Sequence, residues 1–187
     1  MKTSLSLAAV LVFLALPAMA DNYRIEPQFT IPTFEVTHLG FTKQSGRFDK
    51  VAGRATFEVP ARKGSVDLTI YTASIDMASQ AWTAHMKSEG LFDVEKYPTM
   101  RFVSDRLIFS GDKVVAAEGR FTMLGVTKPL RITVDGFHCR TFAERRKTIC
   151  GADVYATIKR SDFGLVKYIP EVSDTINIHV PVEAEKE

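Results

Sequence analysis

"SVDLTIYTASI", residues 65–75, alternates apolar and polar side chains along its length. Val66, Leu68 and Ile70 fall on one face of an extended chain, and the side chains between them fall on the other. A period of two is typical of a β-strand with one buried face, because successive side chains of a strand point to opposite sides of the sheet. The stretch therefore predicts a half-buried strand.

The same alternation recurs through most of the chain. It is found in "TFEVTH" (33–38), "TMRFVSDRLIF" (99–109), "EGRFTMLG" (118–125), "LRITV" (130–134), "VYATIKR" (154–160) and "TINIHV" (175–180). Turn-forming stretches such as "KQSG" and "SGDK" separate the runs. The spacing predicts about eight antiparallel strands in one domain. Because no long helix could cover a sheet, closure into an all-β barrel is the economical way to remove the sheet edges.

The N-terminus has the pattern of a secretory signal peptide. Lys2 precedes an apolar run from Leu5 to Leu16, and a small-x-small cleavage signal ends at Ala20. This run is too short to span a bilayer. We therefore predict that residues 1–20 are removed after Ala20 and that the domain occupies residues 21–187 of an exported protein.

Charge and cysteine content limit the partners. A formal net charge of +2 gives no case for nucleic acid, which requires a clustered basic face. The densest basic run, residues 140–147, is interpreted as a solvated loop, with weak contact to anionic lipid headgroups as the alternative.

Two cysteines, Cys139 and Cys150, favour a disulfide across the base of a hairpin in an exported chain. Two free thiols are the alternative.

The polar stretch "HMKSEGLFDVEKYP" (85–98) has the residue types of a catalytic cluster. His85, Glu89 and Asp93 would share one face of a continuous helix, but Gly90 interrupts it. The histidines show no metal-ligand spacing, and no nucleophile elbow, P-loop or dinucleotide fingerprint occurs. The sequence therefore predicts neither an enzyme nor a metal site.

The segment 79–94 lacks alternation and is interpreted instead as a short helical lid over one mouth of the barrel. An eight-stranded barrel is just wide enough to be filled by its own side chains or to hold one small ligand. From the residues alone, an interior cavity and a solid core are equally possible. The side chains expected to form the interior wall and the lid are Phe34, Val36, His38, Phe48, Phe57, Leu68, Ile70, Trp82, His85, Met86, Leu91, Phe92, Phe102, Phe121, Met123, Ile132, Ile158, Arg160, Phe163, Ile176 and Ile178.

Three of these side chains could select a polar headgroup at the mouth. His38 ends an inward face, His85 lies in the lid, and Arg160 opens the stretch "RSDFGL". For each, a structural contact is the alternative to a ligand contact. For Arg160 that contact would be an ion pair with Asp162 or Asp174.

Several stretches closely resemble the YceI-like family of exported bacterial proteins. They are "FEVTHLGFTKQSGRF" (34–48), "TAHMKSEGLFDVEKYPTMRFVSDRL" (83–107), "EGRFTMLGVTKPLRITV" (118–134) and "GADVYATIKRSDFGL" (151–165). The block H-x-K-S-x-x-x-F-D-V-x-x-Y-P is the most specific of the shared motifs. "AWTAH" departs from the family, which often carries Arg-Asp before the histidine. The cysteine hairpin is similar to that of a cysteine-bearing subset of the family.

The resemblance implies an extended, lipocalin-like, eight-stranded antiparallel barrel in the periplasm. It implies a non-catalytic carrier without a cofactor, whose cavity holds a polyprenyl chain, an isoprenoid quinone, or a fatty amide or acid, for transport, storage or a stress response. We expect transient contact with the inner-membrane surface, and a dimer if the protein oligomerises. The alternatives are a self-filled barrel that binds proteins and an enzyme that acts on the bound lipid.

Overall fold

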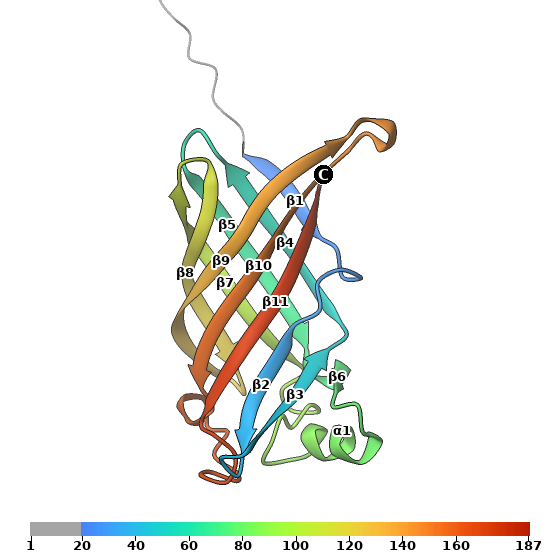
Figure 1. The fold of residues 1–187 in the computed structure, drawn as a ribbon, viewed down its shortest axis with the longest axis vertical. Helices are drawn as coiled ribbons and strands as arrows, with labels where there is room; N and C mark the ends of the chain where they lie inside the picture. The colour runs from blue at the N-terminus through green and yellow to red at the C-terminus, as the bar shows by residue number, and fades with distance from the viewer. Residues whose placement is uncertain (1–19) are drawn as a thin grey trace, which may run out of the picture.

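The computed structural model describes residues 20–187 (Figure 1), so the predicted signal peptide lies outside the described residues except for Ala20. The strands are β1 (Asp21–Ile25), β2 (Thr33–His38), β3 (Thr42–Phe48), β4 (Val51–Glu58), β5 (Lys63–Tyr71), β6 (Ile75–Asp76), β7 (Thr99–Ser110), β8 (Lys113–Met123), β9 (Val126–Phe142), β10 (Lys147–Lys159) and β11 (Thr175–Lys186). The helices are α1 (Gln80–Lys87) and the 3₁₀ turns η1 (Thr72–Ser74), η2 (Ala143–Arg145) and η3 (Arg160–Phe163).

The strands form a closed barrel. Its hydrogen-bonded order is β1-β4-β5-β7-β8-β9-β10-β11, and β11 pairs back onto β1, for example Lys186 with Tyr23. Another part of β11, residues 177–179, pairs with β2 instead of β1, and β2 in turn pairs with β3. Strands β1 and β2 therefore act as one interrupted strand, as do β3 and β4, and eight strands surround the interior. The predicted all-β, eight-stranded antiparallel barrel is confirmed.

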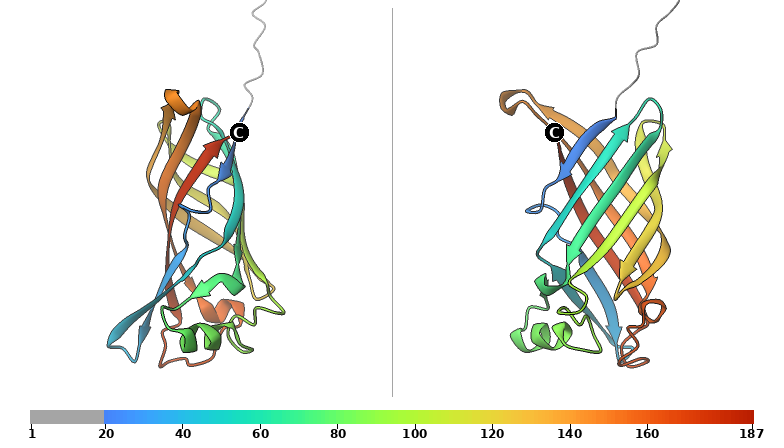
Figure 2. Two further views of the ribbon diagram at one scale, coloured as in Figure 1. Left: turned by 90° about the vertical axis from the view of Figure 1, so that its right-hand side faces the viewer. Right: turned by 180° about the vertical axis from the view of Figure 1, so that it is seen from behind.

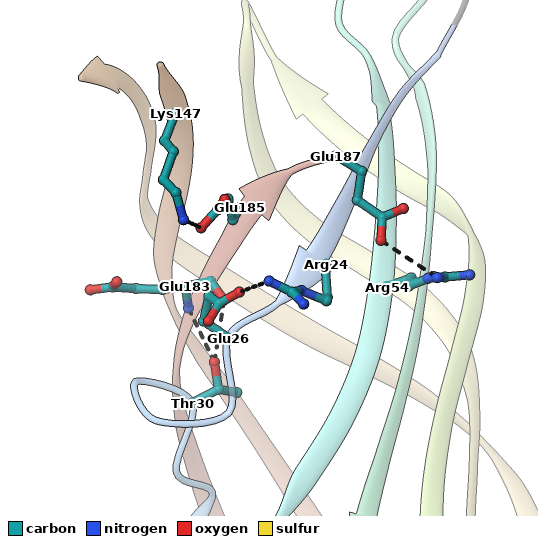
Figure 3. Close-up of polar contacts among 8 residues, drawn as sticks. All are labelled: Arg24, Glu26, Thr30, Arg54, Lys147, Glu183, Glu185 and Glu187. Atoms are coloured by element: carbon teal, nitrogen blue, oxygen red, sulfur yellow. Dashed lines mark hydrogen bonds and ion pairs between the residues drawn. The ribbon is translucent and has the colours of Figure 1, made fainter. Parts of the chain in front are cut away.

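The interruption between β1 and β2 is held by side-chain and main-chain hydrogen bonds to β11 (Figure 3). The Glu26 amide donates to the Glu183 carbonyl at 2.8 Å, and the Glu183 amide donates to the buried Thr30 hydroxyl at 3.2 Å. Around this junction lie exposed ion pairs such as Arg24 with Glu26 and Lys147 with Glu185. Exposed pairs of this kind contribute little to stability, so the Thr30 contacts are what fix the junction.

Bulges shift which side chains face inward, with three register shifts in the pairings of β7 with β8 and of β9 with β10. In β7, Met100 and Phe102 point into the barrel as the alternation predicts, but the register against β8 slips between Val103 and Arg106. The Ser104 hydroxyl accepts from the Arg106 amide at 3.1 Å and donates to the Glu118 carbonyl at 2.7 Å. A bulge adds one residue to one strand, which exchanges the two faces beyond it.

The long hairpin of β9 and β10 projects from one end of the barrel, beside the C-terminus (Figure 1). Cys139 and Cys150 are directly opposite one another in its register and form a disulfide. The disulfide prediction is confirmed. Because both cysteines lie within paired strands, the bond ties the two arms of the hairpin where it leaves the barrel.

Removing the disulfide is expected to destabilise the protein. A Cys139→Ser/Cys150→Ser variant should lose about 3 kcal/mol of unfolding free energy, the value for a short closed loop in the chain-entropy model. Urea denaturation of both proteins measures the loss. Cys150 is one of many residues that line the central cavity, so the folded variant should still take up lipid, and abolished uptake would contradict a purely structural role of the disulfide.

Helix α1 lies at the opposite end of the barrel from the hairpin (Figure 2). Ser79 caps it by accepting from the Trp82 amide, and the Thr83 hydroxyl accepts from the Met77 amide at 3.0 Å. The helix ends at Lys87, so the predicted lid, residues 79–94, is helical only in its first half. Within residues 20–187, no helix is long and apolar enough to cross a membrane.

Candidate functional site

The barrel encloses an apolar cavity of about 170 Å³, which we call the central cavity. Among its lining residues, Thr33 alone carries a hydroxyl, and this group donates to the His179 carbonyl at 3.0 Å. No charged side chain lines the cavity. A cavity with hydrocarbon walls and no free polar group stays dry and accepts only apolar ligands, because an unpaired polar group there would cost free energy.

The alternation correctly identified much of this wall. Thirteen of the expected residues line the central cavity: Phe34, Phe48, Phe57, Leu68, Ile70, Phe92, Phe102, Phe121, Met123, Ile132, Ile158, Ile176 and Ile178. The interior is therefore hollow rather than filled by its own side chains. Contact of these residues with a ligand stays a prediction.

A second cavity of about 180 Å³, which we call the mouth cavity, lies between the end of the barrel and α1. Seven further expected residues line it: Val36, His38, Trp82, His85, Met86, Leu91 and Arg160. Its open surface is almost wholly apolar, as in the central cavity, but several polar side chains belong to its wall. Gln44, Lys167 and Tyr168 join the two histidines there, and the sequence analysis missed all three. The mouth cavity is thus the place where a polar headgroup could be held.

Aromatic side chains separate the two cavities. Phe34 and Phe92 line both of them with their ring centroids 6.4 Å apart, and Phe48 contacts both rings. The ring centroids of Phe48 lie 5.8 Å from Phe34 and 5.5 Å from Phe92, the latter in an edge-to-face arrangement. A chain that passed from the mouth cavity into the central cavity would therefore pass these rings.

Arg160 is a structural residue rather than a free headgroup donor. It is 3% exposed, and four of its N–H groups donate to the carbonyls of Ser173, Leu165, Lys167 and Val172 at 2.7 to 3.0 Å. The expected ion pair with Asp162 or Asp174 is wrong, because the guanidinium bonds main-chain carbonyls instead. Burial lowers the pKa of the guanidinium, and the charge of Asp174 opposes that shift.

Asp174 has its own partner in the same loop. Its carboxylate accepts hydrogen bonds from the Ser161 amide at 2.9 Å and the Ser161 hydroxyl at 2.8 Å. These hydrogen bonds hold the pKa of Asp174 below its usual range. Together with Arg160, they fix the segment 160–174, which carries Lys167 and Tyr168 to the mouth cavity.

The two histidines of the mouth cavity differ in their contacts. Nε2 of His85 lies 3.0 Å from the Tyr168 hydroxyl, which ties α1 to the segment 160–174. Within residues 20–187, the rings of His138 and His179 are also hydrogen-bonded, whereas the His38 ring has no such partner. His38 therefore has a ring nitrogen available to a ligand. No group of three or more His, Cys, Asp or Glu side chains in this part of the chain could hold a metal ion.

One expected wall residue lies elsewhere. Phe163 is 3% exposed and packs edge-to-face on Phe121, with centroids 5.6 Å apart, but lines neither cavity. Conversely, Leu107 and Phe137 line the central cavity and were not predicted. Leu107 follows a bulge in β7 and Phe137 lies within a bulge in β9, and bulges exchange the inward and outward positions of a strand.

Comparison with known proteins places this geometry in a family. A family model described as the YceI-like domain matches residues 23–184. A UPF0312 protein of Pseudomonas putida is 32% identical over 177 residues, which cover 91% of this chain and 89% of that protein. The crystal structure of the Campylobacter jejuni YCEI protein superposes with a TM-score of 0.70 and 26% identity, over 81% of this chain and 90% of that one.

A third similarity concerns the fold alone. A polyisoprenoid-binding domain of Saccharophagus degradans superposes with a TM-score of 0.64 at 14% identity, over 88% of this chain and 98% of that one. The family model, the P. putida relative and the shared barrel agree over nearly all of the described residues. The chain therefore belongs to the YceI-like domain family.

Proposed function

We propose that this protein is an exported, non-catalytic carrier that holds a long-chain isoprenoid lipid, with the chain in the central cavity and the headgroup in the mouth cavity. The observation that carries the proposal is the almost wholly apolar surface of both cavities, with charged or basic side chains in the wall only at the mouth. The central wall has no charged side chain, whereas the mouth wall includes His38, Gln44 and Lys167. A long hydrocarbon tail with a small headgroup fits this arrangement.

The resemblance to the polyisoprenoid-binding domain of S. degradans supports the isoprenoid class of ligand. The disulfide and the signal-like N-terminus support export to the periplasm. Transport or storage of an isoprenoid, including a quinone, is the role that fits a cavity without catalytic groups.

Energetics favour a reversible carrier over a permanent trap. Burying hydrocarbon from water gains about 0.8 kcal/mol per methylene. A lipid that leaves a bilayer is already out of water, so the gain on entering the barrel is small relative to the membrane. Exchange between membrane and barrel is therefore thermodynamically possible in both directions.

The single tryptophan provides a direct test. Trp82 lines the mouth cavity and is 49% exposed, so a lipid that fills this cavity should remove water from the indole. Protein stripped of lipid and titrated with a long-chain polyprenol should show a blue shift of the emission that saturates at equimolar ligand. No saturable change, together with no polyprenol co-eluting with the protein, would contradict the proposal.

His38 should select for the headgroup. His38→Ala is expected to weaken binding of an isoprenoid quinone about fivefold, the value of one hydrogen bond, with little change in the thermal midpoint. Binding of a polyene hydrocarbon of the same length should be unchanged. His138→Ala, on the projecting hairpin, is the control. Equal losses for both ligands, or a matching loss of thermal stability, would show that His38 acts structurally.

A further inference from the structure

Exposed apolar side chains gather at one end of the molecule. Residues 20–187 expose eight large apolar side chains, and five of these lie at the end that carries α1. We call these five the apolar rim: Leu39, Phe41, Trp82, Val166 and Tyr168. Phe41 is 88% exposed and Val166 is 59% exposed. Figure 2 shows the β2–β3 turn, α1 and the segment before β11 together at this end.

Hydrogen bonds join the three segments of the rim. The Leu39 amide donates to the Glu171 carbonyl at 2.6 Å, which fixes the β2–β3 turn to the segment 160–174. The bond between His85 and Tyr168 fixes α1 to the same segment. The rim is therefore one held surface rather than three independent loops.

The rim is continuous with the mouth cavity. Trp82 and Tyr168 line that cavity, yet they are 49% and 46% exposed at the surface. A molecule that touched the rim would thus touch the wall of the cavity as well. The three remaining exposed apolar side chains line neither cavity: Phe29 lies in the loop between β1 and β2, Val115 in β8 and Tyr155 in β10.

The chemistry of the rim fits the surface of a lipid bilayer. Trp and Tyr are enriched where membrane meets water, because each ring has an apolar body and a polar group. Exposed lysines can extend toward headgroups while their stems follow apolar surface, and Lys167 lies against the Tyr168 ring at 5.2 Å. A ligand that is apolar enough to enter the central cavity would also partition into a bilayer.

We propose that the apolar rim docks this protein on the bilayer surface, so that the mouth cavity opens onto the membrane where lipid is exchanged. The proposal rests on the proposed function for the purpose of docking. Acidic groups such as Glu89 and Glu171 accompany the lysines at this end, so binding comes chiefly from apolar insertion. It should therefore depend little on salt, unlike binding by the basic hairpin at the opposite end.

The test combines vesicle flotation with transfer of an isoprenoid quinone between vesicles of phosphatidylethanolamine and phosphatidylglycerol. Phe41→Ser/Val166→Ser should lower vesicle partitioning at least about tenfold, because a phenylalanine and a valine no longer leave water. Transfer should slow in proportion. The matched control, Phe29→Ser/Val115→Ser, removes the same two residue types elsewhere and should behave as wild type.

The outcomes separate this proposal from the proposed function. Wild-type protein that binds polyprenol but does not float with vesicles would overturn docking and leave the carrier function intact. Vesicle binding that persists in Phe41→Ser/Val166→Ser, or that salt abolishes, would contradict docking through the apolar rim. If the wild-type protein sediments as a dimer and only Phe41→Ser/Val166→Ser sediments as a monomer, the apolar rim binds a second copy of the chain and docking on the bilayer is overturned. Vesicle binding without any lipid uptake would support docking and contradict the carrier.

Discussion

Replacing Ala156 with phenylalanine is expected to abolish lipid retention while leaving the barrel folded. Ala156 lines the central cavity from β10, with its side chain toward the open space. A phenyl ring there occupies volume that the hydrocarbon chain needs, so the lipid recovered per protein should fall at least about tenfold. Overpacking a solid core costs roughly 1–3 kcal/mol, whereas a ring that enters a void should leave the unfolding free energy unchanged or higher.

The adjacent residue supplies the control. Thr157 lies on the outer face of β10, where its hydroxyl contacts Asn177. Thr157→Phe adds the same bulk outside the cavity and should retain lipid as wild type does. Solvent extraction with mass spectrometry measures the lipid, and urea denaturation measures stability. Wild-type lipid content in Ala156→Phe would show that the chain does not occupy the central cavity.

Arg160→Met should be the most destabilising substitution in the molecule. It removes the donors of one buried and three partly buried carbonyls, at an expected cost of about 4 kcal/mol. Because the same contacts hold the segment 160–174, the folded fraction should also bind isoprenoid more weakly. Urea denaturation followed by circular dichroism measures the first effect.

Two further variants serve as comparisons for Arg160→Met. Arg160→Lys keeps the charge but not the planar fork, so its loss should be intermediate. Arg106→Met removes an exposed arginine paired with Glu118 and should cost less than about 1 kcal/mol. If Arg160→Met were as mild as Arg106→Met, the carbonyl contacts would not stabilise the loop.

The sequence predicted the barrel because most strands carry a period-two pattern, but the pattern did not mark β1, β3, β4 or β6. In β3 and β4 the inward positions include Gly46 and Gly53, which have no side chain to mark the buried face. The reason is crowding. A Cβ on Gly46 would lie 2.5 Å from the Phe34 ring, and one on Gly53 would lie 2.8 Å from the Ile25 side chain. Large neighbours fill those positions, so a hydropathy pattern could not show them.

The candidate site was predicted unevenly for a similar reason. Alternation along regular strands correctly predicted thirteen side chains in the wall of the central cavity. Beyond a bulge such as the one near Gly136, inward and outward positions exchange, so alternation no longer identifies the inward side chains. The mouth cavity was harder, because the segment 160–174 has no repeating pattern. Its path depends on Arg160 and Asp174 bonding groups brought together by the fold, so Lys167 and Tyr168 could not be placed from sequence.

The most direct measurement is the composition of what the protein carries. Protein purified without detergent should be extracted with organic solvent and analysed by mass spectrometry, beside Ala156→Phe. The account predicts a long-chain isoprenoid at near-equimolar amount in wild type and almost none in the variant. Wild-type protein that contains no such lipid, and takes none up when offered polyprenol or isoprenoid quinone, would contradict it.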